Sequence, residues 1–211
     1  MWAAHMSYIK GSVVKNGLKR QKSFEDYRND RVVGYICDEV LLEECTKIPK
    51  IGLRNKFVHS LIKAYDLIPY MKLFSVSPAT MEELCSFHSS DYICYLKTIN
   101  EMFDPEDDQD LEFGLGYDCP MMKDMFKFAS VVGGGTITAA KVLRNKEVDI
   151  AINWAGGWHH AQRDEAEGFC YINDIVLGIE ELRKEYSYIF YIDLDIHHGN
   201  GVENAFAFTN K

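Results

Sequence analysis

Features that mark several other protein classes are missing from this sequence of 211 residues. Its six cysteines are scattered, with no Cys-x-x-Cys pair, whereas a disulfide framework belongs to much shorter secreted chains. We therefore expect reduced thiols and a reducing compartment. No uninterrupted apolar stretch approaches the ~18 residues that a membrane-spanning helix needs, and the amino terminus lacks the apolar core of a signal peptide. The sequence thus predicts no membrane partner.

Positive charge is also scarce relative to negative charge. The chain has 23 Lys and Arg against 32 Asp and Glu, a formal net charge of −9. This balance argues against direct nucleic-acid binding and is compatible with a cationic partner such as a lysine-rich peptide. Basic residues gather in the first thirty positions, and we expect residues 1–30 to form a poorly ordered arm. Residues 31–211 are enough for one domain with a substantial core.

Within this domain, apolar runs alternate with segments of helical spacing. The predicted strands cover residues 31–36, 72–76, 148–154 and 188–196. The predicted helices cover residues 56–68, 90–102, 122–144 and 173–186, and residues 80–83 have the spacing of a capping box. Nearly continuous apolar strands separated by helices indicate an α/β fold with a parallel sheet covered by helices on both faces. Because little chain follows the last strand, we expect the sheet to be incomplete at the C-terminus.

Three glycines interrupt the predicted helix at 122–144. Gly133, Gly134 and Gly135 are consecutive, and glycine inside a helix costs roughly 1 kcal/mol relative to alanine. The sequence therefore predicts either close packing of another backbone segment or a break in the helix.

Two carboxylates and a histidine end the strand predicted at 188–196. In an extended chain alternate side chains share a face, so Asp193, Asp195 and His197 are expected to point the same way. Such residues at the carboxyl end of a parallel strand lie where open α/β sheets place their ligands, and their oxygen and nitrogen atoms suit zinc. A hydrogen-bonded acidic strand end is the alternative, but burying two carboxylates without a cation is costly.

A histidine pair follows the strand predicted at 148–154. His159 and His160 come after Gly156-Gly157-Trp158. Taken alone, such a pair is more often two hydrogen-bonded polar residues than a catalytic site. A second strand that delivers carboxylates to the same sheet edge favours a general base, because a neighbouring carboxylate fixes the tautomer of an imidazole and raises its basicity.

Four motifs together resemble the class I histone deacetylases, most of all those of the histone deacetylase 8 type. They are Gly-Leu-Gly-Tyr-Asp-Cys-Pro, Asn-Trp-Ala-Gly-Gly-Trp-His-His-Ala, Asp-Glu-Ala-Glu-Gly-Phe-Cys-Tyr-Ile-Asn-Asp and Asp-Leu-Asp-Ile-His-His-Gly-Asn-Gly-Val. The resemblance covers about residues 32–211 and implies an arginase/deacetylase-like sheet, with residues 31–211 forming part of a deacetylase catalytic domain. Arginase-like enzymes carry different aspartate and histidine patterns.

The resemblance implies a role for each motif residue in zinc-dependent amide hydrolysis. Asp195 and His197 are expected to bind the catalytic zinc. His160 is expected to act as general base and later as general acid, beside His159 held by Asp193. At Asn200 the class I pattern usually has aspartate, and a neutral partner stabilises the protonated form of His160 less.

Other residues are assigned to the substrate by the same resemblance. Asp118 is expected to hold the substrate backbone, with Gly168 and Phe169 lining the acetyl-lysine channel and Arg54 lining an internal channel for acetate. The resemblance also implies structural potassium (K+) sites, which we place around the residues Asp193, Asp195, His197, Phe206 and Thr209.

The expected substrates are acetylated lysine side chains of histone tails or other proteins, with co-repressor proteins as partners and a location in nucleus and cytoplasm. The family takes a third zinc ligand and a tyrosine from segments beyond residue 211, so we expect little or no activity from this chain. An acetylpolyamine-type amidohydrolase, or an inactive short isoform or fragment acting as a binding protein, are the alternatives. Asp118 favours a protein substrate over a polyamine.

Overall fold

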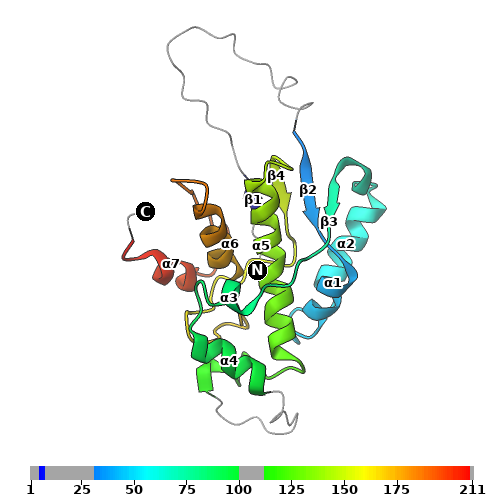
Figure 1. Ribbon diagram of the computed structural model, residues 1–211. Helices are drawn as coiled ribbons and strands as arrows, with labels where there is room; N and C mark the ends of the chain where they lie inside the picture. The colour runs from blue at the N-terminus through cyan, green and yellow to red at the C-terminus, as the bar shows by residue number, and fades with distance from the viewer. Residues whose placement is uncertain (1–4, 8–30, 100–111, 210–211) are drawn as a thin grey trace.

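The computed structural model describes residues 5–7, 31–99 and 112–209. Among these residues, the strands β1 (His5–Ser7), β2 (Val33–Ile36), β3 (Lys72–Phe74) and β4 (Ile150–Ile152) form one sheet in the order β1-β4-β2-β3 (Figure 1). β2 is parallel to β3 and to β4, whereas β1 is antiparallel to β4. Three of the predicted strands and their parallel arrangement are therefore confirmed. Except for β1, the predicted amino-terminal arm lies outside the described residues.

The described helices connect these strands and surround them. They are α1 (Glu39–Thr46), α2 (Arg54–Ala64), α3 (Met81–Leu84), α4 (Ser90–Thr98), α5 (Met125–Arg144), α6 (Asp174–Arg183) and α7 (Asn200–Phe206), with short 3-10 helices η1 (Ile68–Tyr70) and η3 (Glu112–Gly114). Thr80 and Glu83 form the predicted capping box at the start of α3. In the ranges that the structure describes, no helix combines the length and the apolar character that crossing a membrane requires.

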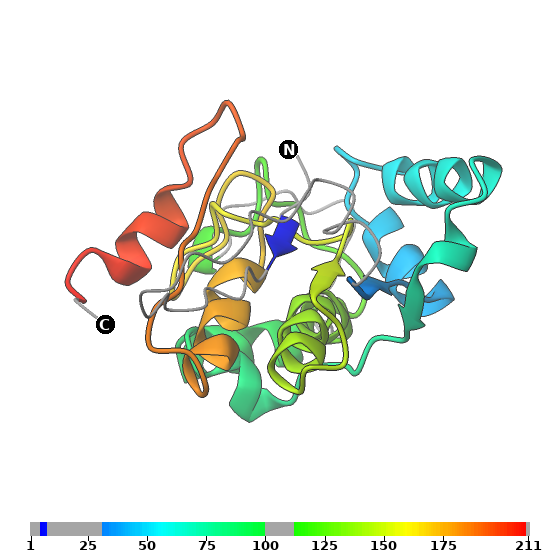
Figure 2. The same ribbon diagram turned by 90° about the horizontal axis from the view of Figure 1, so that it is seen from above.

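Helices cover both faces of the sheet. Alternate residues of β2 face opposite sides: Ile36 shares a buried cluster with Ala139 and Ala140 of α5, whereas the hydroxyl of Tyr35 lies 3.1 Å from Nδ1 of His59 in α2. Seen from above, α5 lies on one side of the strands and α2 on the other (Figure 2). The predicted α/β architecture is confirmed.

The glycine triplet lies inside a continuous helix, so the predicted alternative of a helix break is wrong. A Cβ atom on Gly134 would lie 2.4 Å from the carbonyl oxygen of Ser77 and 2.7 Å from the backbone nitrogen of Ala79. Only glycine permits so close an approach of backbone to helix. The other predicted alternative, close packing of another backbone segment, is confirmed.

The predicted strand at 188–196 is wrong. The segment carries no strand assignment in the described structure, and the side chains of its alternate residues Tyr188, Phe190, Ile192, Leu194 and Ile196 are between 63% and 95% exposed. A run of apolar residues becomes a buried strand only when other strands and helices cover it. Among the described residues nothing covers this face.

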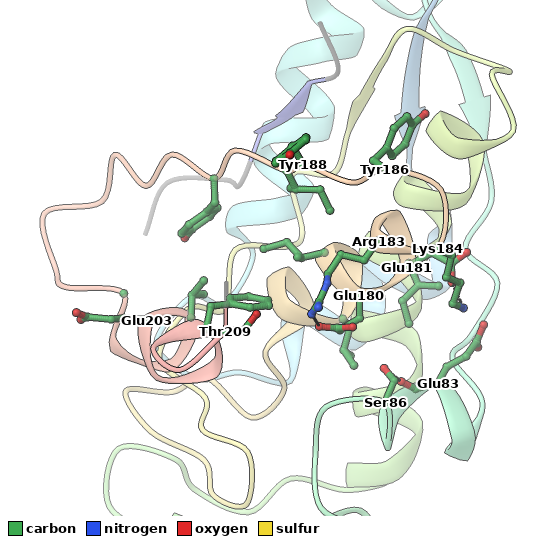
Figure 3. Close-up of a pocket in the computed structure, with 18 of the residues that line it drawn as sticks. Glu83, Ser86, Glu180, Glu181, Arg183, Lys184, Tyr186, Tyr188, Glu203 and Thr209 are labelled. Atoms are coloured by element: carbon green, nitrogen blue, oxygen red, sulfur yellow. Dashed lines mark hydrogen bonds and ion pairs between the residues drawn. The ribbon is translucent and has the colours of Figure 1, made fainter. Parts of the chain in front are cut away.

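A cavity of about 1230 Å³ lies between this segment, α6 and α7. Its lining includes Glu180 and Arg183 of α6 and Glu203 of α7 (Figure 3). It also includes Asp193, but neither His159 nor His160. Although the cavity is large, we therefore do not assign the histidine chemistry to it.

Candidate active site

The backbone just before the histidine pair is held by a buried carboxylate. Asp174, the first residue of α6, accepts hydrogen bonds from the backbone N–H groups of Gly157, at 3.1 Å, and Trp158, at 2.8 Å. The hydroxyl of Thr136 in α5 donates to the same carboxylate. The turn after β4 is thereby tied to two helices immediately before His159.

These hydrogen bonds also act on the charge of Asp174. Burial raises the pKa of this carboxyl, and the hydrogen bonds from Thr136, Trp158 and Gly157 oppose the rise. Hydrogen bonds donated to a carboxylate favour its ionised form. The three donors therefore supply the hydrogen bonds that water would donate to the Asp174 carboxylate if it were exposed.

His159 and His160 lie side by side with their Nε2 atoms 3.1 Å apart. Nδ1 of His159 lies 2.7 Å from Oδ2 of Asp193, and Nδ1 of His160 lies 2.8 Å from Oδ1 of Asn200. With oxygen acceptors on both outer sides, each Nδ1 is the nitrogen that carries a proton. The structure thus brings together the four residues predicted for catalysis, although they come from two segments about 35 residues apart.

Asp193 has a second hydrogen-bond donor that sequence reasoning missed. The hydroxyl of Tyr191 lies 2.5 Å from Oδ2 of Asp193. Burial raises the pKa of Asp193, but the hydrogen bonds from Tyr191 and His159 outweigh it, so its pKa lies below the ordinary value. Asp193 therefore presents a full negative charge to His159 at neutral pH. Tyr191 is two residues before Asp193, which in an extended chain predicts the same face.

The two predicted zinc donors are adjacent, one with a buried side chain and one with an exposed side chain. Oδ1 of Asp195 is 2.9 Å from Nδ1 of His197. The side chain of Asp195 is 4% exposed and that of His197 is 69% exposed. The ring of His197 lies 6.2 Å from that of His160. Within the described ranges, no group of three or more His, Cys, Asp or Glu side chains is placed to hold a metal ion.

A tight turn at Gly168 and Phe169 lies directly against His160. Gly168 has a φ of +55°, and a Cβ atom there would lie 2.7 Å from Cδ2 of His160. Phe169 also has a positive φ, of 54°, and the ammonium group of Lys50 lies 5.3 Å from its ring centre. The structure therefore brings these two predicted channel residues to the histidine pair. Lys50 was not predicted, and no motif in the sequence singles it out.

Two predicted substrate residues come from other segments than the pair. Asp118 is exposed in the turn between Gly116 and Cys119. Arg54 begins α2. Burial raises the pKa of the Cys45 thiol in α1 to about 12, and the charge of Arg54 opposes this rise. In the described structure, neither residue contacts the histidines by a hydrogen bond or ion pair.

The residues predicted for a second potassium site lie near the end of α7. The backbone N–H of Thr209 donates to the carbonyl oxygen of Phe206 at 3.1 Å. A cation there remains a prediction.

Sequence reasoning also missed Glu167. Its carboxylate oxygens lie 2.9 and 3.0 Å from Nδ2 of Asn200, and one of them lies 2.8 Å from Nε2 of Gln162. Glu167 lies inside the third of the quoted motifs, directly before the predicted channel residue Gly168, but no role was predicted for it.

Comparison with known protein families gives a match over most of the chain. The family model described as the histone deacetylase domain matches residues 50–211. The chain belongs to the histone deacetylase family. This deacetylase-family chain is 46% identical over 193 residues to histone deacetylase 8 of Danio rerio, covering 92% of the chain and 51% of the relative.

Two further relatives show how far the match extends. Identity to histone deacetylase 8 of Xenopus tropicalis is 47% over 178 residues, covering 84% of the chain and 48% of the relative. Identity to histone deacetylase 1 of Homo sapiens is 43% over 159 residues, covering 75% of the chain and 33% of the relative. The chain spans about half the length of the two histone deacetylase 8 relatives.

Proposed function

We propose that this chain carries the proton-transfer part of a zinc-dependent protein-lysine deacetylase site. The observation that supports it most is the arrangement of His159 and His160, each with an outward Nδ1 partner and with their Nε2 atoms 3.1 Å apart. Membership of the histone deacetylase family supports the same chemistry. The proposed substrates are acetylated lysine side chains of histone tails or other proteins.

In this proposal the histidines move one proton. With both Nδ1 atoms donating outwards, a hydrogen bond between the two Nε2 atoms requires one further proton. Nε2 of His160 accepts that proton from the attacking water and later donates it to the leaving lysine amine. The negative charge of Asp193 stabilises the pair while it holds the proton.

Asp195 and His197 are the residues that would hold the zinc. Their carboxylate oxygen and imidazole nitrogen are donors that zinc prefers, and they lie 2.9 Å apart on the His160 side of the segment. When bound, zinc polarises the acetyl carbonyl and lowers the pKa of its water. The structural potassium (K+) sites expected around Asp193, Asp195, His197, Phe206 and Thr209 remain predictions.

The proposed substrate contacts come from two turns and from the start of α2. Gly168 and Phe169 would flank the acetyl-lysine side chain beside His160. Asp118, exposed on a neighbouring turn, would accept a backbone N–H of a peptide, and a polyamine offers no equivalent backbone. Arg54 would line an internal path for acetate. Kinship with chromatin deacetylases supports a nuclear location, and a cytoplasmic pool and co-repressor partners are further expectations.

Metal binding tests this proposal in the 211-residue chain. Co2+ titration, followed by its visible absorption, should show binding that His197→Ala weakens at least ~10-fold, because a donor is lost. His198→Ala is the matched control, since the neighbouring His198 is equally exposed and pairs with Glu203. Equal affinities for the wild-type chain and His197→Ala would refute the assignment of the zinc donors.

A further inference from the structure

The amide of Asn200 lies between a histidine and a carboxylate. On one side, Oδ1 of Asn200 is 2.8 Å from Nδ1 of His160. On the other side, Nδ2 of Asn200 is 2.9 and 3.0 Å from the two carboxylate oxygens of Glu167. All three side chains are half-buried, so water competes only partly for these contacts.

Glu167 determines which way the amide of Asn200 faces. An ionised carboxylate can only accept hydrogen bonds, so the NH2 group must be the part of Asn200 that faces Glu167. The carbonyl oxygen then faces His160 and can only accept. Nδ1 of His160 must therefore carry the proton, which leaves the lone pair of the neutral ring on Nε2.

We propose that Glu167 is a positioning residue that, through the amide of Asn200, holds His160 in the tautomer whose Nε2 is free to accept a proton. This inference rests on the proposed role of His160 as general base. Without Glu167 the amide of Asn200 could rotate by half a turn. Its NH2 group would then face the ring and favour a lone pair on Nδ1, with the proton on Nε2.

Glu167 is itself held firmly enough to do this. Nε2 of Gln162 donates to the Glu167 carboxylate at 2.8 Å and to the backbone oxygen of His160 at 3.1 Å. The backbone of Glu167 exchanges two hydrogen bonds with Cys170, at 2.9 and 3.0 Å. These two bonds close the turn that contains Gly168 and Phe169, so the proposed channel wall and the tautomer of His160 depend on one short loop.

The neutral side chain at position 200 matches this arrangement. An aspartate there would place a second carboxylate about 3 Å from that of Glu167, and two such charges cannot both ionise without a large cost. Asn200 and Glu167 therefore form a matched pair. The negative charge is on Glu167 and not on the residue that contacts His160, and the amide of Asn200, oriented by Glu167, presents its oxygen to Nδ1 of His160. Exchanging one member without the other should be unfavourable.

The tautomer can be read directly by NMR. Two-bond 1H–15N spectra of the metal-free, 15N-histidine-labelled chain at about pH 8.5, where histidines are neutral, should show His160 mainly protonated on Nδ1. His160→Gln assigns the signals. In Glu167→Leu, the Nε2-protonated form should become the major species. Glu165→Leu, which removes an exposed glutamate two residues away, should leave the spectrum unchanged. A folded Glu167→Leu chain with an unchanged tautomer would overturn the proposal.

A double-mutant cycle provides a second measurement if Glu167→Leu does not fold. In the chain that has Glu167, Asn200→Asp should lower the folding equilibrium constant. In the Glu167→Gln background the same substitution should lower it much less, because the glutamine amide can donate a hydrogen bond to the new aspartate. We expect the two effects to differ by about tenfold, as for residues in direct contact. Equal effects in both backgrounds would overturn the pairing. Neither measurement needs zinc or substrate, so the two proposals can fail independently. The Co2+ titration can refute the zinc donors while the NMR spectra still support the role of Glu167, and the NMR spectra can refute that role while Co2+ still binds through His197.

Discussion

At the scale of single residues, His88, a buried histidine outside the candidate active site, has a strongly lowered pKa. His88 is 1% exposed. Its Nδ1 lies 3.2 Å from the carbonyl oxygen of Arg163, and its Nε2 accepts the backbone N–H of Asn173, the residue that caps α6, at 3.1 Å. This pattern requires a neutral ring with the proton on Nδ1. Burial lowers the pKa of His88 to about 4.

The depressed pKa of His88 predicts a loss of stability in acid. Because the unfolded chain binds this proton near pH 6.5 and the folded chain only near pH 4, the contribution is complete above about pH 6.5. It falls as the pH drops below 6.5, and by about pH 4 the free energy of unfolding has decreased by about 3 kcal/mol. Urea unfolding of the chain and of His88→Gln at pH 7.5 and pH 4 measures it.

The variant should be less stable at pH 7.5 but lose less on acidification than the wild-type chain. His198→Gln is the control, since His198 is exposed and its removal should leave the acid-dependent loss of stability intact. The same loss in His88→Gln as in the wild-type chain would show that His88 is not its source.

At the scale of elements, the position of α5 depends on the glycine that touches the backbone of residues 77–79. Gly134→Ala would normally stabilise a helix by about 1 kcal/mol. Here the added methyl group would lie 2.4 Å from the carbonyl oxygen of Ser77, and backbone atoms cannot move aside cheaply. We expect Gly134→Ala to destabilise the chain by about 2–3 kcal/mol, measured by chemical denaturation.

Gly133→Ala is the matched comparison one residue earlier in α5. Its Cβ atom would meet the ends of the Leu84 and Leu177 side chains, at 3.1 and 3.2 Å, and flexible side chains can shift by a few tenths of an ångström. Its cost should stay below about 1 kcal/mol. If the two variants were equally stable, backbone contact would not be the reason for the glycine at 134.

At the scale of the whole molecule, the uncovered segment at 188–196 has consequences for solution behaviour. Its five alternate apolar side chains are exposed, and an extended segment without strand partners is a template for pairing between molecules. We therefore expect the 211-residue chain to self-associate.

Phe190→Lys combined with Ile192→Lys should reduce this association, because the charges oppose pairing. Light scattering over a range of concentrations measures it. Phe208→Lys is the control, since Phe208 is fully exposed beyond α7 but lies outside the segment. An equal effect of the control would point to general solubility rather than to strand pairing.

The local parts of this structure follow from the sequence. The strands β2, β3 and β4, the capping box at Thr80 and the parallel arrangement were predicted because they depend on apolar spacing and on short-range hydrogen bonds. The histidine pair and the Asp193–His197 segment were singled out as one site on the expectation that two parallel strands end at one edge. The second of these strands is not present in the described structure, although the two segments do meet. The family followed from those motifs.

Other features depend on contacts between distant segments, which spacing does not specify. Whether the glycines of α5 break the helix or admit another backbone was decided by residues 77–79, more than fifty positions earlier. The run at 188–196 has the composition of a buried strand, yet it stays uncovered because a strand needs neighbours as well as composition. Glu167 lies in a recognised motif, yet its contact was not predicted, because only the fold brings its carboxylate to Asn200. The sequence by itself thus determined which groups this protein has for chemistry, and the tertiary structure decided which of them meet, since a hydrogen bond depends on distance in space.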